Sequence, residues 1–476
     1  MLAMPAGKRG ATLPGWLLAG AAASAAVWAG AATAPAAGTV PAAPEPNLER
    51  SVRAHMEFLA GDALDGRGSG TRDEWIAATY LGARMRDFGL EPLGDAGGFV
   101  QQVGLQRMRA ANPPQLHAGD ATLTHGAQML VLDTEDATAA GALHRFHPGA
   151  QVSPGEVLLM PPEADPEHAN GLDAAAMVLW RENATLRELW PTLAARPLII
   201  GRTQFVGVTP PAVAPRHVPV QIVLDAVGYE AVKRVPENAP ISFVARTQVV
   251  ASHTWNALGL LRGADPAAAK QIVLLSAHLD HLGEQGAGPD RIYNGADDDA
   301  SGTIAVMELA EALVKGPRPR RSVVFALFGS EEAGSLGARY FLDKPTVPVA
   351  QIIANLEFEM IGRSDPAVPE HTLWLTGWQR SNLGPALAAH GARLVGDPHP
   401  KENFFMRSDN ITLARHGVVA QTVSSFGLHA QYHQPDDDIA HIDFAHMTES
   451  IRSLLAPVRW LADSDFMPQW RAGGRP

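Results

Sequence analysis

Five short motifs in the C-terminal half of the chain concentrate histidine, aspartate and glutamate. In chain order they are AHLDHLG at His278, NGADDDASG at Asp298, GSEEAG at Glu331, NLEFEMIGR at Glu359 and YHQPD at His433. The chain has no cysteine, so any metal ion must be bound through imidazole and carboxylate groups. A pair of divalent cations needs two imidazoles, two terminal carboxylates, one bridging carboxylate and a further carboxylate as a base. The five motifs together offer all six groups.

The first motif contains two histidines, of which His278 is the better candidate for a metal ligand. His278 follows an apolar run, and Asp280 lies two positions on, where a carboxylate could hold the second nitrogen of the imidazole. Histidine ligands usually have such an outer hydrogen-bond acceptor. We expect His281 to be solvated or to lie outside the ligand shell, because its position aims it elsewhere.

Three successive aspartates, residues 297–299, occupy a glycine-rich loop in the second motif. Neighbouring carboxylates repel one another, so a cation would stabilise the run, although a solvated acidic turn at a helix start is the alternative. Asp298 is favoured as the bridging ligand, while spacing alone leaves the choice among the three open.

The remaining acidic motifs contain glutamates in close pairs. Glu331 and Glu332 cannot both point the same way from an extended chain, so we expect one to bind metal and the other to face an attacking water. Glu357 and Glu359 share one strand face, and Glu359 is nearer the carboxyl end of its strand. We therefore expect Glu359 to be the ligand and Glu357 to make a structural or outer contact.

Strands and helices alternate around these motifs. The sequence predicts strands at 271–277, 322–329 and 352–358, helices at 302–314 and 335–342, and further elements around 373–376, 381–390, 417–422 and 448–461. Near-continuous apolar strands that alternate with helices indicate an α/β fold with a mostly parallel mixed sheet and helices on both faces. Ligands of such sheets bind beyond the carboxyl ends of the strands, which is where the motifs fall.

The rest of the chain divides by pattern. Residues 1–34 have a positive flank, a short apolar core and small residues, as in a secretory signal peptide, although an uncleaved membrane anchor is the alternative. Residues 35–47 are predicted to be a linker, and 48–111 a helical N-terminal part of the catalytic domain. Residues 112–250 consist of short apolar runs separated by proline and glycine, which predicts an inserted β-rich domain. The catalytic domain then resumes at 251–476.

Composition limits the possible partners. The net charge is −12 and the lysines and arginines are scattered, so no basic face is available for nucleic acid. No segment after the N-terminal one is long and apolar enough to span a membrane. We therefore expect no nucleic acid partner and no membrane span after signal cleavage.

Taken together, the motifs resemble those of the co-catalytic di-zinc metallopeptidases, a family that includes secreted bacterial aminopeptidases, glutamate carboxypeptidase and glutaminyl cyclase. The resemblance covers about residues 256–461 and extends to the segment 58–71, FLAGDALDGRGSGT. It implies a zinc exopeptidase type of fold, and a protease-associated-like domain in the inserted segment. It also implies two Zn²⁺ ions.

Carried onto this sequence, the resemblance assigns the ligands. Asp298 would bridge the two zinc ions. His278 and Glu359 would complete one site, and Glu332 and His433 the other. Most members have aspartate at the position of Glu359, so this chain carries a variant ligand with one more methylene.

The same resemblance assigns the remaining roles. Glu331 would be the general base, Asp280 the outer partner of His278, and Tyr432 a hydrogen-bond donor to the tetrahedral intermediate. The peptide bond between Asp298 and Asp299 would be cis, and the Ser408-Asp409 pair is similar to a further motif near the pocket.

These features predict a secreted or periplasmic zinc exopeptidase that acts on peptides, most specifically an aminopeptidase that uses metal-activated water and Glu331 as base. Glutaminyl cyclisation by a single zinc is the main alternative, and His278 argues against it because a one-metal site does not need that ligand. Carboxypeptidase action and a non-catalytic binding protein on the same fold are further alternatives. A non-catalytic protein that descends from a peptidase is expected to have lost metal ligands, whereas this sequence keeps the full set of candidate ligands.

Overall fold

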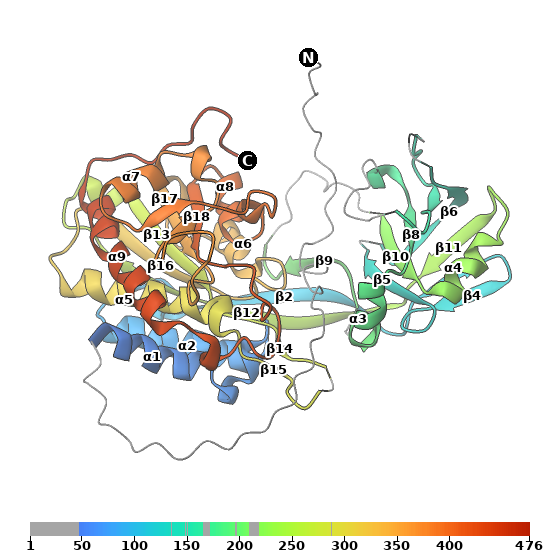
Figure 1. The fold of residues 1–476 in the computed structure, drawn as a ribbon, viewed down its shortest axis with the longest axis horizontal. Helices are drawn as coiled ribbons and strands as arrows, with labels where there is room; N and C mark the ends of the chain where they lie inside the picture. Colours follow the sequence, from blue (N-terminus) through green and yellow to red (C-terminus); the bar gives the residue numbers. More distant parts are fainter. Residues whose placement is uncertain are drawn as a thin grey trace. The chain divides into compact units, whose positions relative to one another are not determined.

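The computed structural model describes residues 47–476, apart from residues 135, 148, 150, 165–171, 196–197, 209–218 and 287. The described chain forms two compact units (Figure 1). We call residues 47–104 together with His253–Pro476 the α/β unit, and Leu105–Ser252 the β unit. The predicted insertion at 112–250 falls inside the β unit.

The predicted signal peptide, residues 1–34, lies outside the described residues, as does the predicted linker up to residue 46. Within the described part of the chain, no helix combines the length and the apolar character that crossing a bilayer requires.

One mixed sheet forms the centre of the α/β unit. Its strands follow the order β19 (Leu394–Gly396), β18 (Leu373–Leu375), β20 (Val419–Ser424), β17 (Ile352–Phe358), β13 (Ile272–His278), β16 (Ser322–Phe328) and β12 (Thr247–Leu261). The four strands β20, β17, β13 and β16 run parallel, whereas β12 and β18 are antiparallel to their neighbours β16 and β20. Next to β12 the order continues with β2 (Val100–Ala110), and both of these strands run from one unit into the other.

Helices cover both faces of this sheet. One face carries α1 (Asn47–Leu59), α2 (Arg72–Asp87), α5 (Gly302–Lys315), α7 (Leu383–Ala389) and α9 (Phe444–Asp463), and the other carries α6 (Leu336–Asp343) and α8 (Asn410–Arg415). The strand sequences explain this arrangement, because every residue of β13 is buried and successive side chains point to opposite faces. Val273 and Leu275 pack under α5, whereas Ile272 and Leu274 pack on the side of α6 and α8. The predicted fold class is confirmed.

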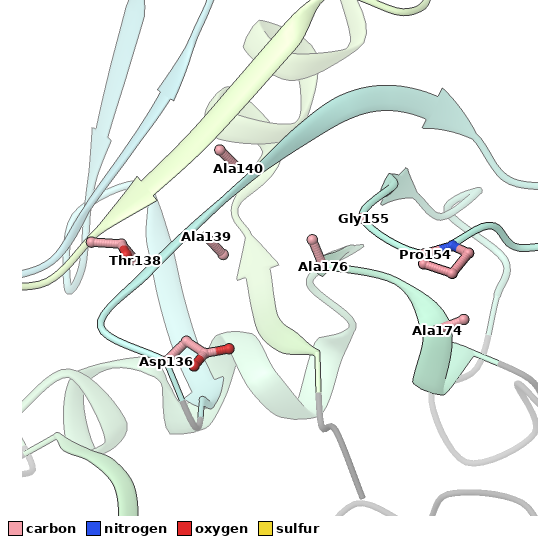
Figure 2. Close-up of a pocket in the computed structure, with 8 residues that line it drawn as sticks. All are labelled: Asp136, Thr138, Ala139, Ala140, Pro154, Gly155, Ala174 and Ala176. Carbon is pink, nitrogen blue, oxygen red and sulfur yellow. The ribbon is translucent and has the colours of Figure 1, made fainter.

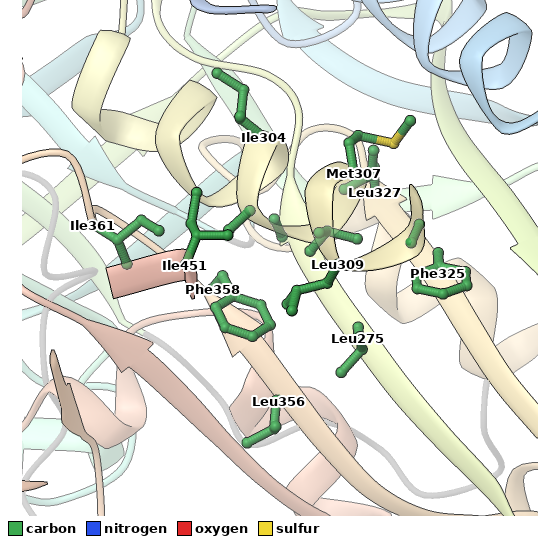
Figure 3. Close-up of a cluster of buried hydrophobic side chains, with 14 of the residues drawn as sticks. Leu275, Ile304, Met307, Leu309, Phe325, Leu327, Leu356, Phe358, Ile361 and Ile451 are labelled. Carbon is green, nitrogen blue, oxygen red and sulfur yellow. The ribbon is translucent and has the colours of Figure 1, made fainter. Parts of the chain in front are cut away.

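A hydrophobic cluster packs on each face of this sheet, and the larger of these two cores lies between the sheet and α5. Ile304 and Met307, one helical turn apart, extend from α5, while Leu275, Phe325 and other side chains rise from the strands below (Figure 3). The helix begins at Gly302, where a Cβ atom would overlap the carbonyl oxygen of Phe358. Glycine is therefore required for α5 to approach the end of β17.

The C-terminal helix α9 begins at Phe444, four residues before the predicted start at residue 448. The carboxylate of Asp443 accepts the backbone N–H of His446 and so caps the helix. Phe444 and Met447, in the added turn, are buried in the larger core. Prediction from the apolar stripe alone missed this turn because the cap lies outside the stripe.

The β unit contains a second sheet, as the predicted β-rich insertion requires. Its strands follow the order β4 (Ala121–Thr124), β3 (Gln115–Ala118), β11 (Pro240–Val244), β6 (Thr138–Arg145), β7 (Val157–Leu159), β8 (Met177–Arg181), β10 (Val220–Leu224) and β5 (Met129–Asp133). The helices α3 (Ala184–Ala195) and α4 (Ala226–Lys233) belong to the same unit, and β9 (Ile199–Phe205) pairs antiparallel with the C-terminal part of β2.

A pocket of about 460 Å³ opens in the β unit beside β6 (Figure 2). Mostly small side chains line it: Asp136, Thr138, Ala139, Ala140, Pro154, Gly155, Ala174 and Ala176. Asp136 is the sole ionisable group of this lining, so the pocket offers no set of groups that could bind a metal ion or carry out acid–base chemistry.

Candidate metal centre

The predicted site residues lie at or beyond the carboxyl ends of neighbouring parallel strands. His278 is the last residue of β13, and Glu359 directly follows β17. Glu331 and Glu332 follow β16 after a short turn. Because these strands run in the same direction, their carboxyl ends meet at one edge of the sheet. The structure brings the side chains together there.

Asp298 lies at the centre of the group. Its Oδ1 lies 3.1 Å from Nε2 of His278, and its Oδ2 lies 3.1 Å from Nε2 of His433. Glu359 Oε1 lies 3.9 Å from His278 Nε2, and Glu332 Oε1 lies 3.2 Å from His433 Nε2. The two oxygens of Asp298 therefore face two different groups of nitrogen and oxygen atoms, as a carboxylate between two cations would.

The neighbouring aspartates have other partners. Asp297 Oδ1 accepts the backbone N–H of Gly362 at 2.6 Å. Asp299 Oδ1 accepts the N–H groups of Gly302 and Met360 at 2.9 and 3.1 Å. Both carboxylates thus fix the backbone around the site, which leaves Asp298 to face the histidines. The peptide bond between Asp298 and Asp299 is cis, as expected.

The donor set fits divalent cations. His278 Nε2, Asp298 Oδ1 and Glu332 Oε1 are buried, and none of them has a hydrogen-bond partner in the described part of the chain. Burying a polar atom without a partner costs about 1–3 kcal/mol. Several such atoms facing one another at 3–4 Å are what zinc requires, since it binds imidazole nitrogen and carboxylate oxygen at about 2.0–2.2 Å.

The pKa values show that the carboxylates attract positive charge. Burial lowers the pKa of His433, but the charge of Glu332 and the close carboxylates of Asp298 and Glu332 outweigh it and raise the pKa to about 10. Burial raises the pKa of Glu332, yet the charge of His433 brings it down to about 2. Burial likewise opposes ionisation of Asp298, but the close imidazoles of His278 and His433 hold its pKa well below the usual range. The cluster favours ionised carboxylates paired with a cation.

His281 was expected to be solvated or outside the ligand shell, and the first expectation is wrong. Its side chain is fully buried, and Nδ1 lies 3.0 Å from Oε1 of Glu332 and 3.8 Å from Oδ2 of Asp298. The backbone of His281 is held next to the glycine-rich loop, because its N–H donates to the carbonyl of Arg67 at 3.1 Å. The motif AHLDHLG shows this second histidine three residues after the first, but it does not show that the side chain is buried.

Glu331 and Asp280 are connected through the backbone. Asp280 Oδ1 accepts the N–H of Glu331 at 2.9 Å, and its Oδ2 accepts the hydroxyl of Ser69 at 2.5 Å. Nδ1 of His278 lies 3.2 Å from the carbonyl oxygen of Asp280 and 3.7 Å from its carboxylate. Burial raises the pKa of Glu331 well above its ordinary value. A carboxyl group that holds protons more readily is suited to accept one from water.

Tyr432 and Glu357 frame the centre. The Tyr432 ring stacks on the His433 ring with centroids 3.9 Å apart, and it also packs against Phe426. The buried carboxylate of Glu357 accepts the hydroxyl of Thr422 at 2.5 Å and that of Ser408. Glu357 is thus occupied by hydroxyl groups, and the Ser408-Asp409 pair lies beside the centre.

The glycine-rich loop at residues 64–71 contributes more than the turn that its sequence indicates. Arg67 is buried and donates to the carbonyl oxygens of Leu279, Asn294 and Gly295 at 3.0, 2.7 and 2.9 Å, and also to that of Leu59. One guanidinium therefore ties the loop after β13 to the loop that carries the aspartates. The sequence contains no sign of this role, because more than 200 residues separate Arg67 from the carbonyls of Leu279, Asn294 and Gly295.

Residues 256–457 match the model of peptidase family M28. This part of the chain is therefore similar to members of that family. The match covers the strands and loops that carry all five motifs, so the M28 region and the site described above coincide.

Curated relatives of the M28 region are aligned over part of their lengths. The chain is 32% identical over 114 residues to leupeptin-inactivating enzyme 1 of Streptomyces exfoliatus, which is 24% of each chain. It is 28% identical to the probable lipoprotein aminopeptidase LpqL of Mycobacterium tuberculosis, over 34% of this chain and 30% of that one. It is 28% identical to leucine aminopeptidase 2 of Trichophyton equinum, over 40% and 41% of the two chains. The chain thus spans less than half the length of these relatives.

Solved structures share the fold over most of the chain. An aminopeptidase from Aneurinibacillus sp. strain AM-1 matches with a TM-score of 0.55 and 15% identity, over 88% of this chain and 95% of that one. A zinc aminopeptidase from Bacillus subtilis matches with a TM-score of 0.53 and 17% identity, over 88% and 97%. At this identity the likeness establishes the fold.

Proposed function

We propose that the protein is a zinc-dependent exopeptidase that removes residues from the N-terminus of peptides. The observation that carries the proposal is the position of Asp298, whose two oxygens face His278 on one side and His433 on the other. The M28 match and the aminopeptidase names of several relatives support the reaction class. The N-terminal sequence supports a secreted or periplasmic location.

In this proposal five side chains would hold two zinc ions. Asp298 would lie between them, His278 and Glu359 would hold one ion, and Glu332 and His433 would hold the other. When bound, the ions would polarise the scissile carbonyl and lower the pKa of a water molecule. Glu359 reaches this position one methylene further than aspartate would, and its Oε1 lies within 4 Å of His278 Nε2, so the longer side chain still fits.

The protein's own groups move the protons. Glu331 takes a proton from the attacking water and later gives it to the leaving amine, which makes it both base and acid of the reaction. Asp280 positions Glu331 through its backbone N–H. Tyr432, held against His433, would donate a hydrogen bond to the oxygen that gains charge in the transition state.

The test is a substrate panel with the full chain stripped of metal and then given zinc. The panel contains aminoacyl p-nitroanilides, their N-acetylated forms, a peptide with a blocked N-terminus and a free C-terminus, and a peptide with N-terminal glutamine. Release of p-nitroaniline from free-amine substrates should require zinc, and the acetylated forms should be inert. Hydrolysis independent of zinc would contradict the proposal.

The remaining substrates of the panel distinguish aminopeptidase action from the other activities considered. Hydrolysis from the free C-terminus of the blocked peptide would indicate a carboxypeptidase. Ammonia release from the glutamine peptide without hydrolysis would indicate a cyclase. A zinc-loaded protein that turns over no member of the panel would favour a binding protein.

A further inference from the structure

His281 carries two buried nitrogen atoms that the proposed reaction does not use. The side chain is fully buried. Nε2 has no hydrogen-bond partner within the described residues, and Nδ1 faces the Glu332 carboxylate at 3.0 Å without the geometry of a hydrogen bond. An imidazole in water has partners for both nitrogens, so burying a nitrogen without a partner costs about 1–3 kcal/mol. A histidine of this kind at the edge of a metal centre needs an explanation.

The positions of four side chains agree with one four-coordinate cation. Glu332 Oε1 lies 3.0 Å from His281 Nδ1 and 3.2 Å from His433 Nε2. Asp298 Oδ2 lies 3.1 Å from His433 Nε2 and 3.8 Å from His281 Nδ1. A tetrahedral zinc ion with bonds of about 2.0–2.1 Å separates its ligand atoms by about 3.4 Å. The four N···O distances, from 3.0 to 3.8 Å, lie on both sides of this value.

The two imidazoles approach from different directions. The rings of His281 and His433 are 5.6 Å apart between centroids, and their planes are inclined by 67°. Neither ring stacks on the other, so both nitrogens can point to a common centre. This arrangement is compatible with two histidine ligands of a single ion.

The fold fixes the His281 ring in place. The N–H of His281 donates to Arg67, and its carbonyl accepts the N–H of Ser69 at 3.3 Å, so the glycine-rich loop holds the backbone on both sides. The ring lies against Gly295, where a Cβ atom would come within 2.5 Å of the ring. A ligand held in this way is already in place before the metal arrives.

We propose that His281 is a direct metal ligand, so that the two sites of the centre are unequal. One site then has four protein ligands, His281, Asp298, Glu332 and His433, and the other has three, His278, Asp298 and Glu359. This inference rests on the zinc pair of the proposed function. It predicts that the four-ligand site holds zinc more tightly and is filled first.

The opposing interpretation keeps His281 as an outer partner that donates Nδ1–H to Glu332. The number of imidazoles bound per zinc distinguishes these two interpretations. An imidazole that is not bonded to zinc does not contribute to the ligand shell that X-ray absorption detects. X-ray absorption at the zinc edge, on the full chain with two equivalents of Zn²⁺, should give an average of about 1.5 imidazoles per zinc if His281 binds and about 1.0 if it does not.

The variant His281→Gln should lower this average to about 1.0 and weaken the tighter zinc about 100-fold or more in competition with a chelating dye. His446→Gln is the matched control, because His446 is also buried but donates to or accepts from Ser425 outside the centre. It should leave both the imidazole count and the affinity of the tighter zinc near those of the wild type.

An average of about 1.0 in the wild type, or a count unchanged in His281→Gln, would overturn the proposal. The wild-type measurement decides even if the variant fails to fold. Fewer than two bound zinc ions in the wild type would instead count against the metal pair of the proposed function. Zinc-dependent peptidase activity with one imidazole per zinc would leave the proposed function standing and remove this inference alone.

Discussion

The carboxylate of Asp280 accepts the backbone N–H of Glu331 at a distance of 2.9 Å. Asp280 follows β13 and Glu331 follows β16, so this hydrogen bond joins the loops at the ends of two parallel strands. The residue expected to orient a histidine ligand therefore also fixes the backbone of the proposed base. If Glu331 is the base, the Asp280 carboxylate would set its position relative to the proposed zinc ions.

This contact gives the first prediction. Asp280→Ala removes the acceptor for Glu331 and for Ser69, so kcat should fall about 100-fold as Glu331 loses its position. Asp280→Asn keeps an oxygen for the Glu331 N–H, and the Ser69 hydroxyl can rotate to accept from the amide, so its loss should be about tenfold. Steady-state kinetics of both variants, with zinc content measured in parallel, check this order. Equal losses in the two variants would show that the hydrogen-bond acceptor is not what matters.

The second prediction separates neighbouring glutamates. Glu331→Gln should lower kcat about 10³-fold while two zinc ions remain bound, because the amide cannot take a proton from water. Glu332→Gln should instead weaken zinc binding, since it loses a charged ligand beside His433. Zinc titration and kinetics on the same preparations make the comparison. Substantial activity in Glu331→Gln would remove the residue from its assigned role.

The sequence predicted the parts of this molecule that depend on local pattern. The apolar runs around Leu275 and Phe325 indicated buried strands, and alternation with helices such as α5 indicated a parallel sheet. The parallel sheet then implied that His278 and Glu359, each at a strand end, would meet. The structure brings together all five residues that were expected to bind metal. Their roles as ligands remain a prediction.

The parts that the sequence did not predict depend on contacts between distant segments. Nothing near Arg67 in the chain indicates that its guanidinium binds carbonyls more than 200 residues away. The burial of His281 follows from the same loop, so it could not be deduced from the AHLDHLG motif alone. Among the aspartates, only the hydrogen bonds of Asp297 and Asp299 to the backbone single out Asp298.

The third prediction concerns Arg67. Arg67→Lys keeps the charge but cannot reach four carbonyl oxygens at once, so several buried acceptors would lose their partners at about 1–3 kcal/mol each. We expect the free energy of unfolding to fall by about 3–5 kcal/mol, and zinc affinity to fall with it because the two metal loops are no longer tied together. Chemical denaturation and zinc competition measure the two effects.

Arg72→Lys is the control for this substitution. The Arg72 side chain is 78% exposed, and its nearest acceptor, Asp73, is 3.8 Å away, so the exchange should change stability by less than about 0.5 kcal/mol. If Arg67→Lys also stayed within that range, the carbonyl contacts of Arg67 would contribute little to the stability of the centre.

The fourth prediction concerns a buried pair, His55 and Glu308, that is not part of the proposed metal centre. His55 accepts or donates a hydrogen bond of 2.7 Å with Tyr80, and its Nε2 lies 3.9 Å from Oε1 of Glu308 on α5. Burial lowers the pKa of His55 to about 4, and burial raises the pKa of Glu308 to about 7. Both groups are therefore held in their neutral forms in the folded protein around pH 5–6.

The two groups change stability with pH in opposite directions. The raised pKa of Glu308 means that the folded state binds more protons than the unfolded state between about pH 4.5 and 7, so stability falls as pH rises through this range. The lowered pKa of His55 means that the unfolded state binds more protons between about pH 4 and 6.5, so stability rises with pH there. Above pH 7 the cost of the Glu308 charge remains alone.

Replacing Glu308 by Gln should therefore stabilise the protein at alkaline pH and not at acid pH. At pH 8 the gain should be about 3 kcal/mol, the free energy that corresponds to a rise of the pKa from 4.5 to about 7, and it should nearly vanish below about pH 4, where the carboxyl is mostly neutral in both states. Denaturant unfolding at the two pH values measures the difference. Glu311→Gln on the same helix breaks an ion pair with Lys315, whose side chain is 71% exposed, and should change stability by less than about 0.5 kcal/mol at both. A Glu308→Gln variant less stable than the wild type at pH 8 would mean that the ionised carboxylate is stabilised by its surroundings, against the direction that burial gives its pKa.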